Sequence, residues 1–192
     1  MRANRAALTT LVAALMSPSP LGASLMVPHT IESLTESAQH VVQGRVSGSY
    51  CAWDDDHRRI LTFTEIEVDE HVSLDEGSAQ EDAVLVRTLG GVIGPVGMRV
   101  SGVPHFEVGQ EVLLFLRTGS GGSRDAMRLV GLGQGAWKVD RTGATVMVRP
   151  MTEGIAFASS GSGPQAVELA ELRAKVRAAA ASGSGPESPR TQ

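Results

Sequence analysis

Apolar and polar residues alternate with a period of two over much of the chain between Val41 and Arg149. The alternation is clearest from Ile60 onward, where Ile60, Thr62, Thr64, Ile66 and Val68 occupy every second position. Acidic residues occupy the intervening positions from 65 to 69. Because successive side chains of a strand point to opposite faces, this pattern predicts one long, half-buried strand over residues 60–72.

Six shorter segments are also predicted to be strands, because each is rich in β-branched or apolar residues and is bounded by glycine or turn residues. They are residues 40–48, 83–87, 112–116, 127–132, 136–139 and 144–149. Residues 112–116 are apolar on both faces, which predicts a central strand at the heart of the core. Gly44 and Gly48 in the first segment predict a bulge or bend. Strands at this spacing indicate a barrel or a sandwich.

Two segments have a helical period instead. Residues 30–38 place Ile31, Leu34 and Ala38 on one face, with Thr30 as the expected N-cap. Near the other end, Pro164 is expected to open a helix whose buried face contains Leu169, Leu172 and Val176. The sequence therefore predicts a mainly β domain with a short N-terminal helix and a C-terminal helix.

The first 23 residues have the three parts of a secretory signal peptide. Arg2 and Arg5 form a basic start, residues 6–16 are almost entirely apolar, and residues 17–23 are rich in Ser and Pro and end at Ala23. The apolar run is shorter than the roughly 20 residues needed to span a bilayer. A buried N-terminal helix is the alternative interpretation. We expect a secreted or periplasmic protein that is cleaved near Ala23.

The expected organisation therefore has four parts. Residues 1–23 are the signal peptide, and residues 24–158 are a β-barrel domain led by the short helix. Residues 159–181 are a linker and the C-terminal helix. Residues 182–192 are rich in Ser, Gly and Pro and are expected to form a disordered tail.

Charge and cysteine usage narrow the possible partners. The chain has 17 basic and 21 acidic residues, so its net charge is −4, and removal of Arg2 and Arg5 with the signal would make it −6. An acidic domain of this kind is not suited to nucleic acid or to an anionic membrane surface, whereas cationic partners remain possible. Cys51 is the single cysteine, so no intramolecular disulfide can form. It is expected to be a buried small residue, with an intermolecular bridge as the alternative.

Familiar catalytic motifs do not occur in the sequence. The five histidines are scattered singly, without a second His or Cys at the spacing of metal ligands. The glycine-rich residues 90–97 are followed by neither the Lys nor the helix of a phosphate-binding loop, and are expected to bend the backbone at a barrel corner. Residues 160–163 have the composition of a flexible linker. We therefore predict no catalytic, cofactor-binding or metal-binding residue.

Residues 54–57, with the sequence Asp-Asp-Asp-His, form the densest polar cluster of the chain. Carboxylate oxygens could bind a hard cation there. However, calcium-binding loops spread their ligands over about 12 residues, and two arginines follow this cluster immediately. A solvated connection between two strands is the favoured interpretation.

Several segments, in their order along the chain, resemble the netrin-like module of the tissue inhibitors of metalloproteinases. These are the short helix, residues 38–46, the long strand from Ile60, residues 83–88, and residues 109–116. The resemblance implies a small antiparallel OB-like β-barrel. Those inhibitors bind the zinc of their target through an N-terminal Cys-x-Cys, which this chain lacks, so no functional residue is carried over. The Gly90-Gly91 pair and the later Pro-x-Phe-x-x-Gly-x-Glu segment, residues 104–111, also resemble exported bacterial proteins.

Three functions follow as hypotheses. The leading one is an exported, non-catalytic module that binds a protein partner in the envelope or outside the cell. The second is an inhibitor or companion of an exported protease, which depends on the resemblance alone. The third is an enzyme with an unfamiliar site, for which Asp54, Asp56 and His57 are the first candidates.

Overall fold

The computed structural model describes residues 24–74, 79–119, 126–158 and 163–183. The predicted signal peptide, most of the linker and nearly all of the tail lie outside these residues. The described chain is mainly β with two helices, as the sequence predicts. Its elements are β1 (Ser24–Met26), α1 (Ile31–Ser37), β2 (His40–Trp53), β3 (Ile60–Leu74), β4 (Ala83–Leu89), β5 (Gly91–Ile93), β6 (Val96–Met98), β7 (Glu111–Thr118), β8 (Ala126–Leu129), a 3-10 turn (Leu132–Gly135), β9 (Ala136–Asp140), β10 (Met147–Pro150), β11 (Ile155–Phe157), β12 (Val167–Glu168) and α2 (Leu169–Gly183).

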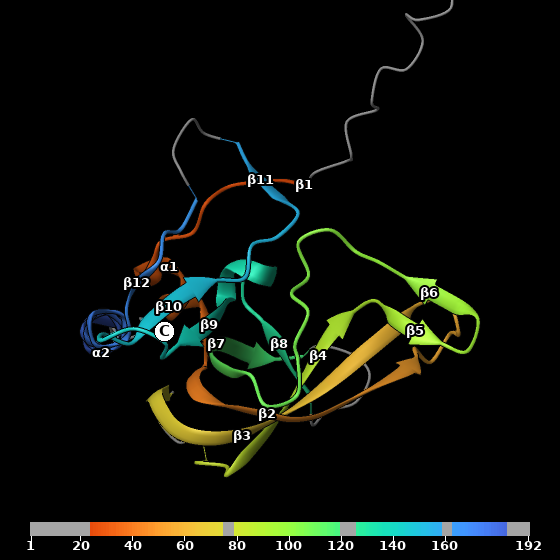
Figure 1. Ribbon diagram of the computed structural model, residues 1–192, viewed down its shortest axis with the longest axis horizontal. Helices are drawn as coiled ribbons and strands as arrows, with labels where there is room; N and C mark the ends of the chain where they lie inside the picture. Colours follow the sequence, from red (N-terminus) through yellow and green to blue (C-terminus); the bar gives the residue numbers. More distant parts are fainter. Residues whose placement is uncertain (1–23, 75–78, 120–125, 159–162, 184–192) are drawn as a thin grey trace, which may run out of the picture.

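One sheet contains most of the strands, in the order β12-β10-β9-β7-β2-β3-β4-β8, and β8 also pairs with β7 (Figure 1). β1 pairs with β11, and β5 with β6, as separate two-stranded sheets. The expectation of a purely antiparallel arrangement is wrong in two places, because β4–β8 and β1–β11 are parallel. Both parallel pairs join strands that are far apart in the sequence, with connections long enough for a crossover.

β2 and β3 form the longest hairpin of the structure. They pair from His40 with Leu74 to Trp53 with Ile60, and the register shifts at three points along β2. The predicted bulges are thus confirmed. No residue with a side chain fits in place of Gly44, because a Cβ at this position would lie 2.1 Å from the backbone oxygen of Glu67. This close approach lets β2 bend between its two ends.

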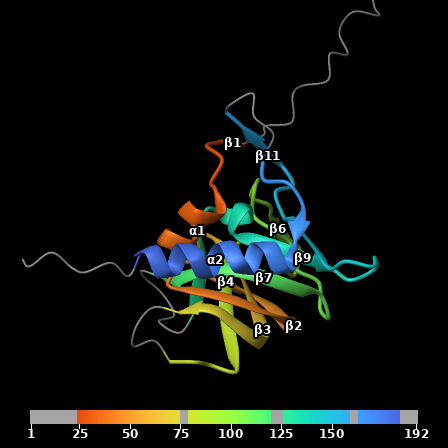
Figure 2. The same ribbon diagram turned by 90° about the vertical axis from the view of Figure 1, so that its left-hand side faces the viewer.

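β7 separates two groups of buried residues, and its six residues from Glu111 to Leu116 are all buried. Leu113 and Phe115 pack with Trp137 and the inner faces of α1 and α2, whereas Val112, Leu114 and Leu116 pack with β2, β3 and β4. The predicted central strand is therefore confirmed. Figure 2 shows α2 lying across the sheet beside α1.

The predicted N-terminal helix is confirmed together with its cap, since the Thr30 hydroxyl accepts a hydrogen bond from the Ser33 N–H at 3.2 Å. The C-terminal helix begins at Leu169 instead of near Pro164, because Val167 and Glu168 pair with β10. Residues 91–98 form the β5–β6 hairpin, where only backbone bends were expected. Residues 132–135 form a 3-10 turn and not the end of a strand.

The far end of the β2–β3 hairpin extends beyond β7. β7 pairs with β2 only as far as Arg45, and β3 continues alongside β4. We call residues 46–53 of β2, residues 54–59 and residues 60–67 of β3 the β2–β3 arm. The β5–β6 hairpin lies against this arm, at the right of Figure 1.

Candidate binding site

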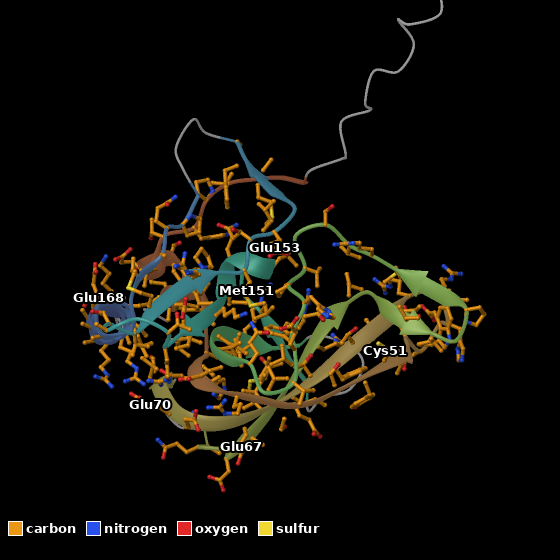
Figure 3. All side chains as sticks on the ribbon, viewed as in Figure 1. Cys51, Glu67, Glu70, Met151, Glu153 and Glu168 are labelled. Atoms are coloured by element: carbon orange, nitrogen blue, oxygen red, sulfur yellow. The ribbon has the colours of Figure 1, made fainter. Side chains whose placement is uncertain are left out.

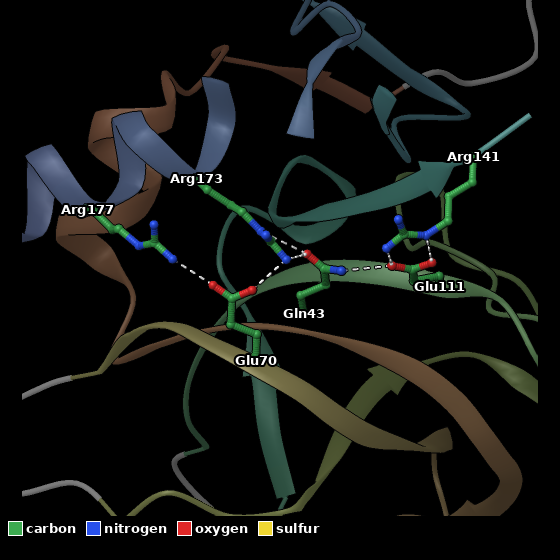
Figure 4. Close-up of polar contacts among 6 residues, drawn as sticks. All are labelled: Gln43, Glu70, Glu111, Arg141, Arg173 and Arg177. Carbon is green, nitrogen blue, oxygen red and sulfur yellow. Dashed lines mark hydrogen bonds and ion pairs between the residues drawn. The ribbon is translucent and has the colours of Figure 1, made fainter. Parts of the chain in front are cut away.

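Two groups of polar residues stand out, and the first joins α2 to the sheet (Figure 4). Arg141 donates two hydrogen bonds to the Glu111 carboxylate, at 2.7 and 2.5 Å. Gln43 donates to Glu111 at 2.8 Å and accepts from Arg173 at 2.6 and 3.1 Å. Arg173 and Arg177 both contact Glu70, at 2.5 and 2.7 Å. We call these six residues the helix network.

The helix network is internally satisfied. Gln43 and Glu111 are buried, and each of their side-chain polar groups meets a partner within the network. The hydrogen bonds from Arg141 lower the pKa of Glu111 against the opposing effect of burial, and the same contact raises the pKa of Arg141. A hollow of about 410 Å³ lies beside it, but its two arginines, Arg141 and Arg173, already belong to the network. The network therefore holds α2 in place, and the arginines beside the hollow are already bonded to Glu111, Gln43 and Glu70.

The second polar group borders a hollow of about 460 Å³ at the β2–β3 arm. Its apolar lining comes from several elements: Ala52, Trp53, Leu61, Phe63, Leu89, Val103, Pro104, Leu129 and Leu132. Its charged lining consists of Asp54, Asp55, Asp56, Arg59, Arg87 and Arg128. We call this space the arm hollow. An apolar surface surrounded by charges of both signs is suited to a partner's side chains.

Asp54 shapes the loop at the end of the arm. Its carboxylate accepts hydrogen bonds from the N–H groups of Arg58 at 2.7 Å and Arg59 at 2.9 Å, and from the Arg59 side chain at 2.9 Å. These contacts, the Arg59 backbone first among them, lower the pKa of Asp54 to about 2. Asp54 is thus an ionised group that fixes a turn, and it is not poised to exchange protons near neutral pH.

The other residues of the 54–57 cluster lie with Asp54 in the connection between β2 and β3. Asp55 and Asp56 are exposed and border the hollow, and neither has an ion-pair partner within the described residues. His57 is exposed in the turn with φ of 53°. Across the part of the chain that the structure describes, no group of three or more His, Cys, Asp or Glu residues could hold a metal ion. The favoured interpretation, a solvated connection between two strands, is confirmed.

The outer face of the arm carries an ordered row of side chains. Tyr50, Phe63 and Arg87 lie opposite one another on β2, β3 and β4. Tyr50 stacks on Phe63 and is itself 52% exposed. This row continues into the arm hollow, which Phe63 and Arg87 both line. Trp and Arg side chains in such concave surfaces contribute strongly to protein–protein binding.

Cys51, labelled in Figure 3, follows Tyr50 along β2, so its side chain points to the opposite face of the arm. Its Sγ is 3.5 Å from the Thr62 hydroxyl, and β5 packs over it so closely that a Cβ on Gly91 would come within 2.5 Å of the sulfur. The side chain is half-buried. Its contacts resemble those of a small packed residue more than those of a thiol presented to another chain.

Several residues of the arm hollow were not found by the sequence analysis. Arg87 and Arg128 come from β4 and β8, which are joined by a long connection, so no local pattern links them. Leu132 stands between two glycines, which was a detectable sign in the sequence. In the structure it adopts φ of 56°, and 38% of its surface is exposed. Trp53 lines the arm hollow, and Trp137 is buried in the core.

A scan of the chain against models of protein families found no match, and a search among curated proteins found no similar sequence. The described helices include none that is both long and apolar enough to cross a bilayer.

Proposed function

We propose that this chain is an exported, non-catalytic protein-binding module built on an OB-like β-barrel, and that it binds its partner at the arm hollow. Strand pairing supports the barrel. β2 pairs with β3, β3 with β4, β4 with β8, β8 with β7, and β7 with β2, so hydrogen bonding passes around five strands. The OB-fold is likewise a five-stranded, partly open Greek-key barrel.

The position of the arm hollow also fits this fold. OB-folds bind ligands on their second and third strands and at the loops beside them. Here the corresponding strands are β3 and β4, and the loop after the first strand is residues 54–59. Both strands and the loop contribute residues to the hollow. The acidic balance of the chain argues against an oligonucleotide ligand and in favour of a protein.

The observation that carries the proposal is the apolar lining of the arm hollow. Leu132 and Leu89 remain 38% and 36% exposed there, beside Trp53 and bordered by arginines. A packed core would have covered these leucines, whereas a binding surface keeps them available. Export is supported by the basic start at Arg2 and Arg5, the apolar residues 6–16 and the small-residue exit at Ala23.

The experiment is site-specific photo-crosslinking of the full chain in its own cells. A photoreactive phenylalanine analogue replaces Leu132 in one variant and Ala174, exposed on α2, in the matched control. Leu132 should give a discrete cross-linked product with an envelope or extracellular protein, and Ala174 should not. Equal products at both positions, or none at Leu132 in a folded and exported chain, would contradict the proposal.

A further inference from the structure

One edge of the sheet remains open along the β2–β3 arm. On the side of β2 away from β3, Val46 is the last described residue of the strand whose backbone is hydrogen-bonded. Its N–H donates to the Gln110 C=O, and its C=O accepts from the Gly109 N–H. From Ser47 to Trp53, the backbone bonds of β2 within the described chain are those to β3. In this segment Ser47, Ser49 and Tyr50 are exposed, and Cys51, Ala52 and Trp53 are half-buried.

Two hydrogen bonds determine which groups point to the open side. Asp54 donates its N–H to the Arg59 C=O at 2.8 Å, and Ile60 accepts from the Gly90 N–H at 2.8 Å. Because bonding alternates along an antiparallel ladder, Tyr50 and Ala52 direct their backbone groups toward β3. The N–H and C=O groups of Ser49, Cys51 and Trp53 therefore point to the open edge.

Beyond the register shift between Val46 and Gly48, this edge lacks the features that usually prevent another strand from adding to a sheet. Natural edges carry charged residues or proline, or are very short. Residues 47–53 contain neither a charge nor a proline. Elsewhere, β10 ends in Arg149 and Pro150, and the part of β3 beyond β4 carries Asp69, Glu70 and His71. The edge at residues 47–53 is therefore the one best suited to strand addition among these.

We infer that an extended segment of a partner protein, carrying a basic side chain, adds to the sheet along residues 47–53 of β2. The inference rests on the proposed function and specifies how the partner binds. Backbone hydrogen bonds to Ser49, Cys51 and Trp53 would provide affinity, and neighbouring side chains would provide specificity. Ala52 and Trp53 line the arm hollow, so a strand on this edge runs directly beside it.

Charge determines the chemistry of that segment. The arm, residues 46–67, contains five carboxylates and two arginines, so it is acidic. Asp55 and Asp56 lie just past the open edge and are exposed. A basic side chain at the corresponding end of the added strand would approach them. A second copy of this chain would instead bring two acidic arms together, which is unfavourable.

The test uses the full mature chain and a displayed library of random peptides about ten residues long. We expect the enriched peptides to contain Lys or Arg, to lack proline at their centre, and to protect the amides of Ser49, Cys51 and Trp53 from hydrogen exchange. Ser49→Pro removes one outward N–H and leaves the ladder to β3 intact, so it should weaken binding about tenfold or more. Ser49→Ala, the matched control, keeps the backbone group and should bind as the parent does.

Four results would overturn the inference: no enriched peptide, protection of amides elsewhere, equal binding by a folded Ser49→Pro variant, or dimers of the chain that protect the same three amides. Because the amide measurement uses the unaltered chain, the test does not depend on whether Ser49→Pro folds. A specific cross-link from Leu132 together with failure here would leave the binding function standing and remove only the strand-addition mode.

Discussion

The phenol ring of Tyr50 stacks on the ring of Phe63, its direct partner on the neighbouring strand, with centroids 5.1 Å apart and planes inclined by 12°. Phe63 is buried beneath this contact, whereas Tyr50 is half exposed. An exposed aromatic side chain held in a fixed orientation suits a binding surface better than a mobile one, because less conformational entropy is lost on binding.

Replacing Tyr50 by Ala should therefore affect both stability and binding. We expect the free energy of unfolding to fall by about 1 kcal/mol, the value of an aromatic pair, when it is measured by urea denaturation. Binding of peptides selected on the arm should weaken as well. Tyr50→Phe keeps the stacking and should preserve both properties. A Tyr50→Ala variant as stable as the parent would show that the pair contributes little.

Glu111 provides a test of the helix network. Glu111→Gln removes the charge that Arg141 binds, and we expect a loss of about 1.5 kcal/mol in unfolding free energy at neutral pH. Glu67→Gln, at an exposed position on β3, is the matched control and should change stability little. Equal losses in both variants would contradict a specific role for the network.

The lowered pKa of Glu111 also predicts that the stability of the protein depends on pH. The pKa of Glu111 is lowered in the folded protein, so its contribution is fully present above the ordinary value of 4.5 and is lost as the pH falls through the lowered pKa. The stability difference between the parent and Glu111→Gln should therefore shrink in acid. Urea titrations at several pH values measure it, and a difference that stays constant down to strongly acidic pH would refute the prediction.

Arg173 should hold α2 more strongly than Arg177. Arg173 is 27% exposed and contacts both Gln43 and Glu70, whereas Arg177 is 60% exposed and contacts Glu70. Arg173→Ala leaves the oxygen of buried Gln43 without this donor, and should lower stability by about 2 kcal/mol and speed amide exchange in α2. Arg177→Ala should cost less than about 1 kcal/mol. A larger loss from Arg177→Ala than from Arg173→Ala would contradict this order.

The strands of the core were predictable because each carries its own periodic pattern. β3 alternates between covered and exposed residues from Thr64 to Asp69, and β7 is a continuous apolar run that becomes buried on both faces. Gly44 also marked its bulge correctly, since that position has no room for a side chain. In each case, neighbouring residues alone determined the outcome.

The remaining features depend on distant partners. β5 and β6 have three residues each and fold back around Gly94 and Pro95, which is too short for a period to be visible. Val167 and Glu168, which were expected to lie in the C-terminal helix, instead form β12 because they pair with β10. The helix network joins Gln43 to Arg173 across 130 positions. The local sign of this network in the sequence was Gln43, a polar residue that follows two valines in a predicted strand.

The proposed strand addition depends on an open edge along β2, and amide hydrogen exchange of the full chain, followed residue by residue by NMR, tests this most directly. The amides of Ser49, Cys51 and Trp53 should exchange rapidly, whereas those of Tyr50 and Ala52, which bond to β3, should be protected. Uniform protection across residues 49–53 would show that the edge is already covered and would contradict strand addition.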